Sequence, residues 1–172
     1  MRATRGFTLV EILIVVVILG ILAAIVIPQF TEASTEARES SLVSDLQSLR
    51  SQIELYKAQH LDSPPAAGLT DAALFENQMI YCSDKEGTVN PVLTRVRSDL
   101  FPLGPYMERL PENPFADDGL PMVTVVNAEF TDAGRGGTGT ASWLYSSLTG
   151  EIYADDDWDG KDTDTLPDHI GL

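Results

Sequence analysis

The chain has 172 residues, 44% of them hydrophobic, and a formal net charge of −15 at pH 7. This length corresponds to about one domain, and an acidic chain without a stripe of lysine and arginine excludes nucleic acid as an expected partner. The single cysteine, Cys82, excludes an internal disulfide and is expected to be a small buried residue.

The first predicted element is an apolar helix that follows a short basic leader. Residues 12–31 contain no charged side chain, which is enough for one helix across a hydrocarbon core of roughly 30 Å. Arg2 and Arg5 precede this run and acidic residues dominate after it. The positive-inside rule therefore places the N-terminus in the cytoplasm and the remainder of the chain outside.

Glu11 lies at the edge of the apolar run. An unpaired carboxylate costs about 2.5–3.5 kcal/mol near the centre of a membrane helix, and less near its end. Glu11 therefore requires a partner, unless the segment is a plain single-pass anchor in which this acid is incidental.

The stretch RGFTLVEILIVVVILGILAAIVIP resembles the class III leader and first helix of type IV pilins and of type II secretion pseudopilins, including the major, G-type pseudopilins. The resemblance implies that a membrane prepilin peptidase cleaves between Gly6 and Phe7, which removes residues 1–6, and that Phe7 is N-methylated. It also implies that Glu11 neutralises the amine of Phe7, on a neighbouring subunit or on its own, during docking into a filament. Such a pair is attractive in a low-dielectric medium, where a lone acid is costly.

Pro28 lies within the apolar helix, which we expect to span residues 7–31. A proline removes one helical hydrogen bond and clashes with the preceding turn, and Gly20 lies eight residues upstream. The segment from Gly20 to Pro28 is therefore the predicted site of a kink or of local melting. The resemblance implies that it loses helicity when subunits pack.

An amphipathic helix is predicted over residues 32–62, continuous with the apolar one. Its apolar side chains recur at alternating spacings of four and three: Leu42, Leu46, Leu49, Ile53 and Tyr56. The stripe is expected to form the spine of a globular core. The helix is expected to end before Pro64 and Pro65.

Residues 63–121 are interpreted as a helical and proline-rich connector. A short helix is predicted within residues 70–83, with Thr70 or Asp71 as its N-cap. A helical turn is predicted over 106–110, between turns marked by proline and glycine. This connector resembles, more weakly than the leader does, a segment found in one bacterial branch of pseudopilins.

An antiparallel β-sheet is predicted over residues 122–154. Gly150 suits the positive φ of a hairpin turn between its last two strands. The glycine-rich loop at 134–140 lacks the features of a phosphate cradle. Three runs rich in β-branched or aromatic residues supply the strands, at 122–130, 141–146 and 150–154. The expected fold class is thus α+β, with a long N-terminal helix, transmembrane in one half and amphipathic in the other, packed on a small sheet.

Residues 155–172 form an acidic C-terminal loop. Its D-x-D-x-D-G pattern is that of calcium loops, in which alternating carboxylates converge on the ion. Leu166 stands where such loops place a bidentate glutamate, so Asp162, Asp164 or Asp168 has to supply the missing oxygens. The alternative is a solvated tail that binds no ion. The expected ligands are Asp155, Asp157, Asp159, the carbonyl of Lys161, Asp162 and Asp164.

The favoured function is a structural subunit of a periplasmic pseudopilus in type II protein secretion, anchored in the inner membrane before extraction into the filament. The implied partners are further copies of the chain, the peptidase, an inner-membrane assembly platform and a cytoplasmic ATPase. We expect no enzyme, because His60 and His169 stand in no catalytic arrangement and each is expected to be solvated or capping. The alternatives are a type IV pilin of a surface filament and a monomeric membrane-anchored binding module.

Overall fold

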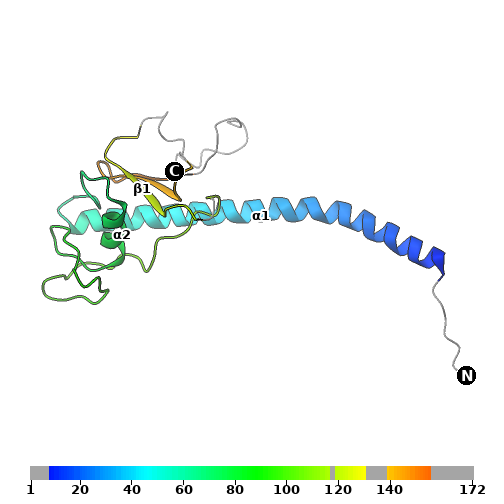
Figure 1. Ribbon diagram of the computed structural model, residues 1–172, viewed down its shortest axis with the longest axis horizontal. Helices are drawn as coiled ribbons and strands as arrows, with labels where there is room; N and C mark the ends of the chain where they lie inside the picture. Colours follow the sequence, from blue (N-terminus) through cyan, green and yellow to red (C-terminus); the bar gives the residue numbers. More distant parts are fainter. Residues whose placement is uncertain (1–7, 117–118, 131–138, 156–172) are drawn as a thin grey trace, which may run out of the picture. The chain divides into compact units, whose positions relative to one another are not determined.

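The computed structural model describes residues 8–116, 119–130 and 139–155, and the chain forms two compact units, residues 1–39 and 40–172 (Figure 1). The fold is α+β, as expected, with two helices and three strands in the described residues. In chain order these elements are α1 (Leu9–Gln59), α2 (Ala72–Ile80), β1 (Val123–Val126), β2 (Trp143–Ser146) and β3 (Ile152–Ala154).

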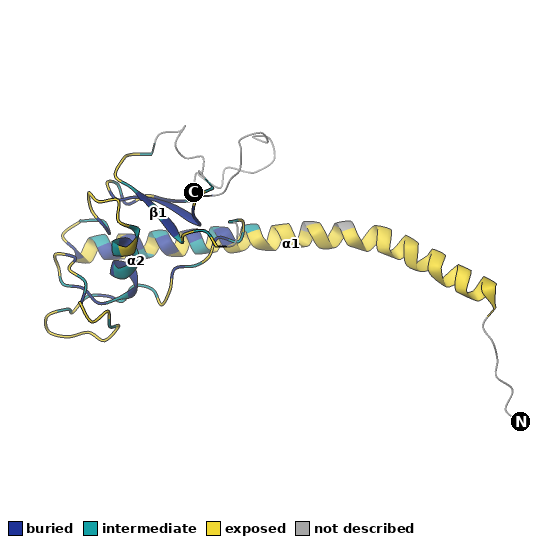
Figure 2. Ribbon diagram, in the orientation of Figure 1, coloured by how far each residue is buried: buried dark blue, intermediate teal, exposed yellow. Residues whose placement is uncertain are grey.

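The N-terminal part of α1 exposes its apolar side chains (Figure 2). Its most apolar window has a mean hydropathy of 3.3, and α1 is the one helix of the described residues that is long and apolar enough to cross a membrane. The backbone is helical at both Gly20 and Pro28. The loss of helicity expected between them concerns packed subunits and stays a prediction.

The C-terminal part of α1 supplies the spine of the core, as the spacing of its leucines predicts. All five residues of the predicted stripe are buried, and Leu49 has no exposed surface. Burying one such side chain is worth about 1.5–3 kcal/mol, so the stripe fixes this part of the helix against the rest of the second unit. The residues packed around it include Phe75, Met79, Val125, Trp143, Tyr145 and Ile152.

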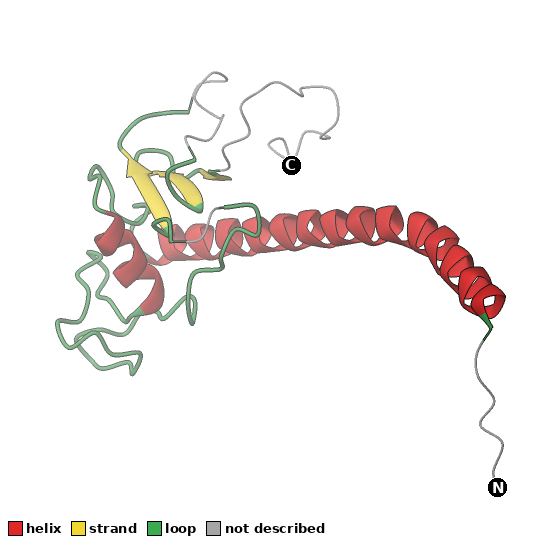
Figure 3. Ribbon diagram, turned by 45° about the vertical axis from the view of Figure 1, so that its right-hand side comes forward, coloured by secondary structure: helices red, strands yellow, loops and turns green. Residues whose placement is uncertain are grey.

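The three strands form one sheet, drawn in yellow in Figure 3, with the order β1-β2-β3. The sheet is mixed, so the prediction of an antiparallel sheet was wrong in part. Strands β2 and β3 are antiparallel, with Gly150 at φ +84° in the turn, as expected. Strands β1 and β2 are parallel, with Val123 opposite Trp143. The physical reason is the connection over 127–142, because a connection of about a dozen residues or more is long enough to return the chain to the start of a parallel neighbour.

Asp71 caps α2, and its carboxylate accepts a hydrogen bond from the backbone N–H of Leu74 at 3.0 Å. The helical turn predicted over 106–110 is absent from this described segment. The backbone N–H groups of Tyr106 and Met107 both donate to the carbonyl of Met79, each at 3.0 Å. These two bonds hold residues 106 and 107 to the end of α2, so the position of this segment is set by α2 and not by a local turn.

Cys82 is buried, as expected, but His60 is not the solvated or capping residue that the sequence suggested. The His60 side chain is 2% exposed and stacks on Tyr56, with ring centroids 3.7 Å apart. Its Nδ1 lies 2.9 Å from the carbonyl of Tyr56 and its Nε2 lies 2.9 Å from Oγ of Ser83. Because a carbonyl only accepts, Nδ1–H donates to it and Nε2 accepts from the hydroxyl, which satisfies a neutral ring completely.

We expect acidification below about pH 6.5 to destabilise the second unit through His60. Burial lowers the pKa of His60 below its ordinary value, against the opposing influence of the hydrogen bond to the Tyr56 carbonyl and of Asp84 and Glu86. The unfolded chain then binds the proton at a higher pH than the folded chain does. Stability is therefore lost as the pH falls, at a slope of at most about 1.4 kcal/mol per pH unit for one proton.

Chemical denaturation of the full chain and of His60→Gln, between about pH 7.5 and 5.5, measures this slope. All other ionisable groups are shared by the two proteins, so the difference between the two curves isolates His60. Parallel curves would show that the buried imidazole does not titrate differently in the folded state.

Candidate functional site

Thr8 and Glu11 form a reciprocal hydrogen-bonded pair at the start of α1. Oε2 of Glu11 accepts from the backbone N–H and from the hydroxyl of Thr8, each at 2.8 Å. The backbone N–H of Glu11 lies 3.3 Å from Oγ1 of Thr8. This arrangement is a capping box, in which the side chains of the residue before the helix and of its third residue each satisfy a backbone N–H.

The capping box gives Glu11 a partner within its own chain. Gly6 and Phe7 lie outside the described residues, so the predicted pairing of Glu11 with the Phe7 amine is not tested. Among the residues described, only Thr8 donates hydrogen bonds to the Glu11 carboxylate. Both of these bonds reach Oε2. The second carboxylate oxygen is thus available for a cation from outside this helix.

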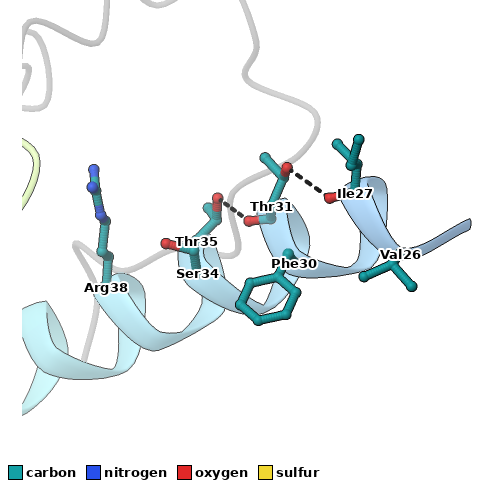
Figure 4. Close-up of a pocket in the computed structure, with 7 residues that line it drawn as sticks. All are labelled: Val26, Ile27, Phe30, Thr31, Ser34, Thr35 and Arg38. Carbon is teal, nitrogen blue, oxygen red and sulfur yellow. Dashed lines mark hydrogen bonds between the residues drawn. The ribbon is translucent and has the colours of Figure 1, made fainter. Parts of the chain in front are cut away.

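A groove of about 520 Å³ follows one face of α1, just beyond the most apolar stretch (Figure 4). Two hydroxyls beside it are bonded to their own helix, Thr31 to the carbonyl of Ile27 and Thr35 to that of Thr31, each at 3.1 Å. Phe30 remains 75% exposed there. Two of the three hydroxyls that line this face are thus satisfied within the helix, which lowers the cost of covering them with an apolar surface. Its lining residues are Val26, Ile27, Phe30, Thr31, Ser34, Thr35 and Arg38.

Asp155 is the only predicted calcium ligand among the described residues, and it is fully buried. Its Oδ1 accepts from the backbone N–H of Gly139 at 3.0 Å. Its Oδ2 accepts from the N–H groups of Thr140 and Ala141, at 3.3 and 3.0 Å. A carboxylate surrounded by amide donors is held as an anchor for the chain entering β2, and its lone pairs are directed at those donors.

The other predicted ligands lie outside the described residues: Asp157, Asp159, Lys161, Asp162 and Asp164. Within the described ranges, no group of three or more histidine, cysteine, aspartate or glutamate side chains could hold a metal ion. The described residues therefore form no metal site, and the expectation of calcium binding rests on the sequence pattern.

Sequence reasoning missed three of these interactions. The T-x-x-E spacing of Thr8 and Glu11 is the signature of a capping box and predicts it directly. His60 follows Tyr56 by four residues and so continues the buried stripe of α1. The anchor at Asp155 has no such signal, because nothing in a run of aspartates distinguishes the one that meets backbone amides.

Comparison with known proteins finds similarity at the N-terminus and along the chain. Residues 1–27 match the family model of the prokaryotic N-terminal methylation motif. A type II secretion system core protein G from Klebsiella pneumoniae is 31% identical over 118 residues, which is 69% of this chain and 74% of the relative. One from Aeromonas hydrophila is 29% identical over 164 residues, 94% of this chain and 96% of the relative.

A fimbrial protein from Pseudomonas aeruginosa is 33% identical over 111 residues, which is 57% of this chain and 72% of that relative. No solved structure matches the chain with significance. The match to the Aeromonas hydrophila protein extends over nearly the whole length of both chains, whereas the fimbrial match covers little more than half of this one.

Proposed function

The chain belongs to the family of the type II secretion system core protein G, and from this premise we propose that it is a structural subunit of a pseudopilus filament, assembled through its N-terminal helix. The proposal rests on the exposed apolar surface and the acid of α1. Its N-terminal part presents apolar side chains with no described partner, and its first turn carries an acid, Glu11, that keeps one oxygen available. A helix of this kind fits both a membrane and a bundle of identical helices.

The similarity to a fimbrial protein supports a second candidate, the subunit of a surface filament. Both candidates use the same leader and the same apolar helix. The greater coverage of the core protein G relatives favours the pseudopilus.

Formaldehyde cross-linking of cells that produce the full chain together with its assembly machinery tests the function. A filament subunit gives a ladder of oligomers of this chain, because neighbouring copies lie in contact. A monomeric membrane-anchored module gives no ladder. The location of the oligomers, beneath or beyond the outer membrane, separates a pseudopilus from a surface filament.

Membrane topology and processing are part of the proposal. By the positive-inside rule, the basic leader supports a cytoplasmic N-terminus and a second unit in the periplasm. We propose that a prepilin peptidase cuts after Gly6, that Phe7 is methylated, and that an inner-membrane platform and a cytoplasmic ATPase act on the subunit. Assembly of a filament needs energy, and the sequence contains no nucleotide-binding motif. We therefore propose that the ATPase is a separate protein.

We expect Gly6→Leu to block removal of the leader, because a bulky side chain at the cut occupies the place of a residue without a side chain. The measurement is the intact mass of the membrane-extracted protein. The chain without substitutions should begin at methylated Phe7. More than about 90% of the variant should keep residues 1–6, which is about a tenfold excess of uncleaved over cleaved chain. Efficient cleavage of Gly6→Leu would refute the assignment of the site, and Gly20→Leu serves as the control for a new side chain elsewhere.

Calcium binding by the acidic loop is a further part of the proposal. Oxygen-rich, alternating carboxylates without neighbouring cysteine suit calcium. The contacts of Asp155 favour its role as an anchor, so the ligands proposed here are Asp157, Asp159, the carbonyl of Lys161, Asp162 and Asp164. A bound ion would reduce the mutual repulsion of these carboxylates and would tie the C-terminal loop together where the chain has no disulfide.

A further inference from the structure

The segment between α2 and β1 exposes several large apolar side chains that lie close together in the sequence. Within residues 91–101, which we call the 91–101 loop, Val92 is 79% exposed, Val96 73% and Leu100 77%. Single apolar residues on a surface need no explanation, whereas a cluster of them indicates an interaction site. This loop belongs to the second unit and lies outside the apolar part of α1, so a membrane span does not account for it.

Hydrogen bonds hold the backbone of the loop in place. Asn90 is buried and accepts from the N–H of Leu93 through its carbonyl, at 2.8 Å, and from that of Val92 through Oδ1, at 3.0 Å. The N–H of Cys82 donates to the carbonyl of Thr94 at 3.1 Å. The apolar side chains are therefore presented on an ordered loop, and an ordered surface loses less entropy when it binds.

The same loop carries a net positive charge in an acidic protein, because it contains Arg95 and Arg97 against the one acid Asp99. Nε of Arg97 donates to the carbonyl of Gly104 at 2.6 Å, and Nη2 of Arg95 donates to the carbonyl of Glu108. A guanidinium has five N–H donors, so one carbonyl contact leaves most donors and the whole charge available. Neither arginine forms an ion pair with a carboxylate in the described parts of the chain.

We propose that the 91–101 loop docks on a carboxylate-bearing surface of a second copy of this chain. Apolar side chains flanked by two arginines fit an acidic partner, and the chain itself carries a net charge of −15. The inference deepens the proposed function and rests on it, because a filament brings copies of the chain together at high local concentration. The loop thus supplies a contact between the second units, in addition to the contact through the apolar helices.

Position 96 allows the partner to be identified directly. Cys82 is buried, so Val96→Cys introduces the one thiol that a reagent reaches in the described residues. The variant is made in cells with the full assembly machinery, coupled to a photoactivatable maleimide, illuminated and digested. Cross-linked peptides from this chain, containing aspartate or glutamate and recovered from a band with the mass of two copies, are the expected result. Cross-links only to another protein, or none, would overturn the inference.

The contribution of the apolar side chains is tested by the double change Val96→Ser and Leu100→Ser. Formaldehyde cross-linking of these cells should give about tenfold less oligomer than the unchanged chain does. The melting temperature of the purified chain should stay the same, because both side chains are already exposed. Leu148→Ser is the matched control, since Leu148 is 54% exposed on the turn between β2 and β3, and it should keep the ladder.

The ladder also separates failure of the inference from failure of the proposed function. If the chain without substitutions gives no ladder of oligomers, the filament function is contradicted, and the inference with it. If the chain without substitutions and the double variant both give the ladder, only the inference is contradicted.

Discussion

Glu11→Ala is expected to reduce filament assembly about 100-fold while leaving cleavage of the leader intact. In the filament the carboxylate of Glu11 would face the amine created at Phe7, and an amine left without it in a low-dielectric surrounding is costly. A cost of about 2.5–3.5 kcal/mol, the value for a charge within a membrane helix, corresponds to this factor. The measurement combines the formaldehyde ladder, for assembly, with the intact mass, for cleavage.

Val15→Ala is the matched control for this prediction. It shortens an exposed side chain on the same stretch of α1 without changing charge. Assembly by Glu11→Ala at the level of Val15→Ala would show that the acid is incidental and that assembly does not depend on a charge pair at Glu11. A chain that also loses cleavage would show that Glu11 acts before assembly, at the peptidase.

The Thr8–Glu11 capping box changes the expectation for a milder variant. Glu11→Gln keeps a side-chain oxygen for the bonds from Thr8, yet it loses the charge that would neutralise an amine. It should therefore retain the helix start and lose assembly nearly as far as Glu11→Ala. A partial loss would mean that capping of α1, rather than charge pairing, accounts for much of the effect of Glu11.

The long helix was predictable because two strong patterns agree along it. An uncharged apolar run requires a membrane span or a buried helix, and the spacing of residues 42–56 admits only one buried face. The capping role of Asp71 was predictable for a similar reason, because its side chain acts on backbone only a few residues away. Local interactions of this kind are encoded in adjacent letters of the sequence.

The pairing of β1 with β2 and the burial of His60 depend on segments distant in the chain. The turn at Gly150 encodes the hairpin of β2 and β3, whereas the long connection before β2 carries no comparable signal of direction. The ring of His60 is stabilised by Ser83, whose position depends on the whole connector. Asp155 is the clearest case, because its amide partners come from residues 139–141.

Asp155→Ala is expected to lower the melting temperature of the full chain in detergent by about 6–12 °C, whether calcium or a chelator is present. The variant leaves three backbone N–H groups near β2 without their acceptor, and each buried unsatisfied group costs about 1–3 kcal/mol. Because water partly reaches Gly139 and Thr140, we expect the total loss of folding free energy to be about 3 kcal/mol. The loss is structural, so it should not depend on the ion.

Asp157→Ala is expected to behave in the opposite way, and the comparison separates the two roles of the aspartates. The unchanged chain should gain about 5–10 °C at a calcium concentration 100 times the dissociation constant, because binding then contributes about 2.7 kcal/mol. Asp157→Ala should lose this gain and match the unchanged chain in chelator, whereas Asp155→Ala should keep it. If calcium shifts none of the three proteins, the acidic loop binds no ion, and the surface-filament candidate becomes at least as well supported as the pseudopilus. If Asp155→Ala alone loses the calcium response, its carboxylate coordinates the ion after leaving the amides of residues 139–141, and the anchor interpretation is wrong.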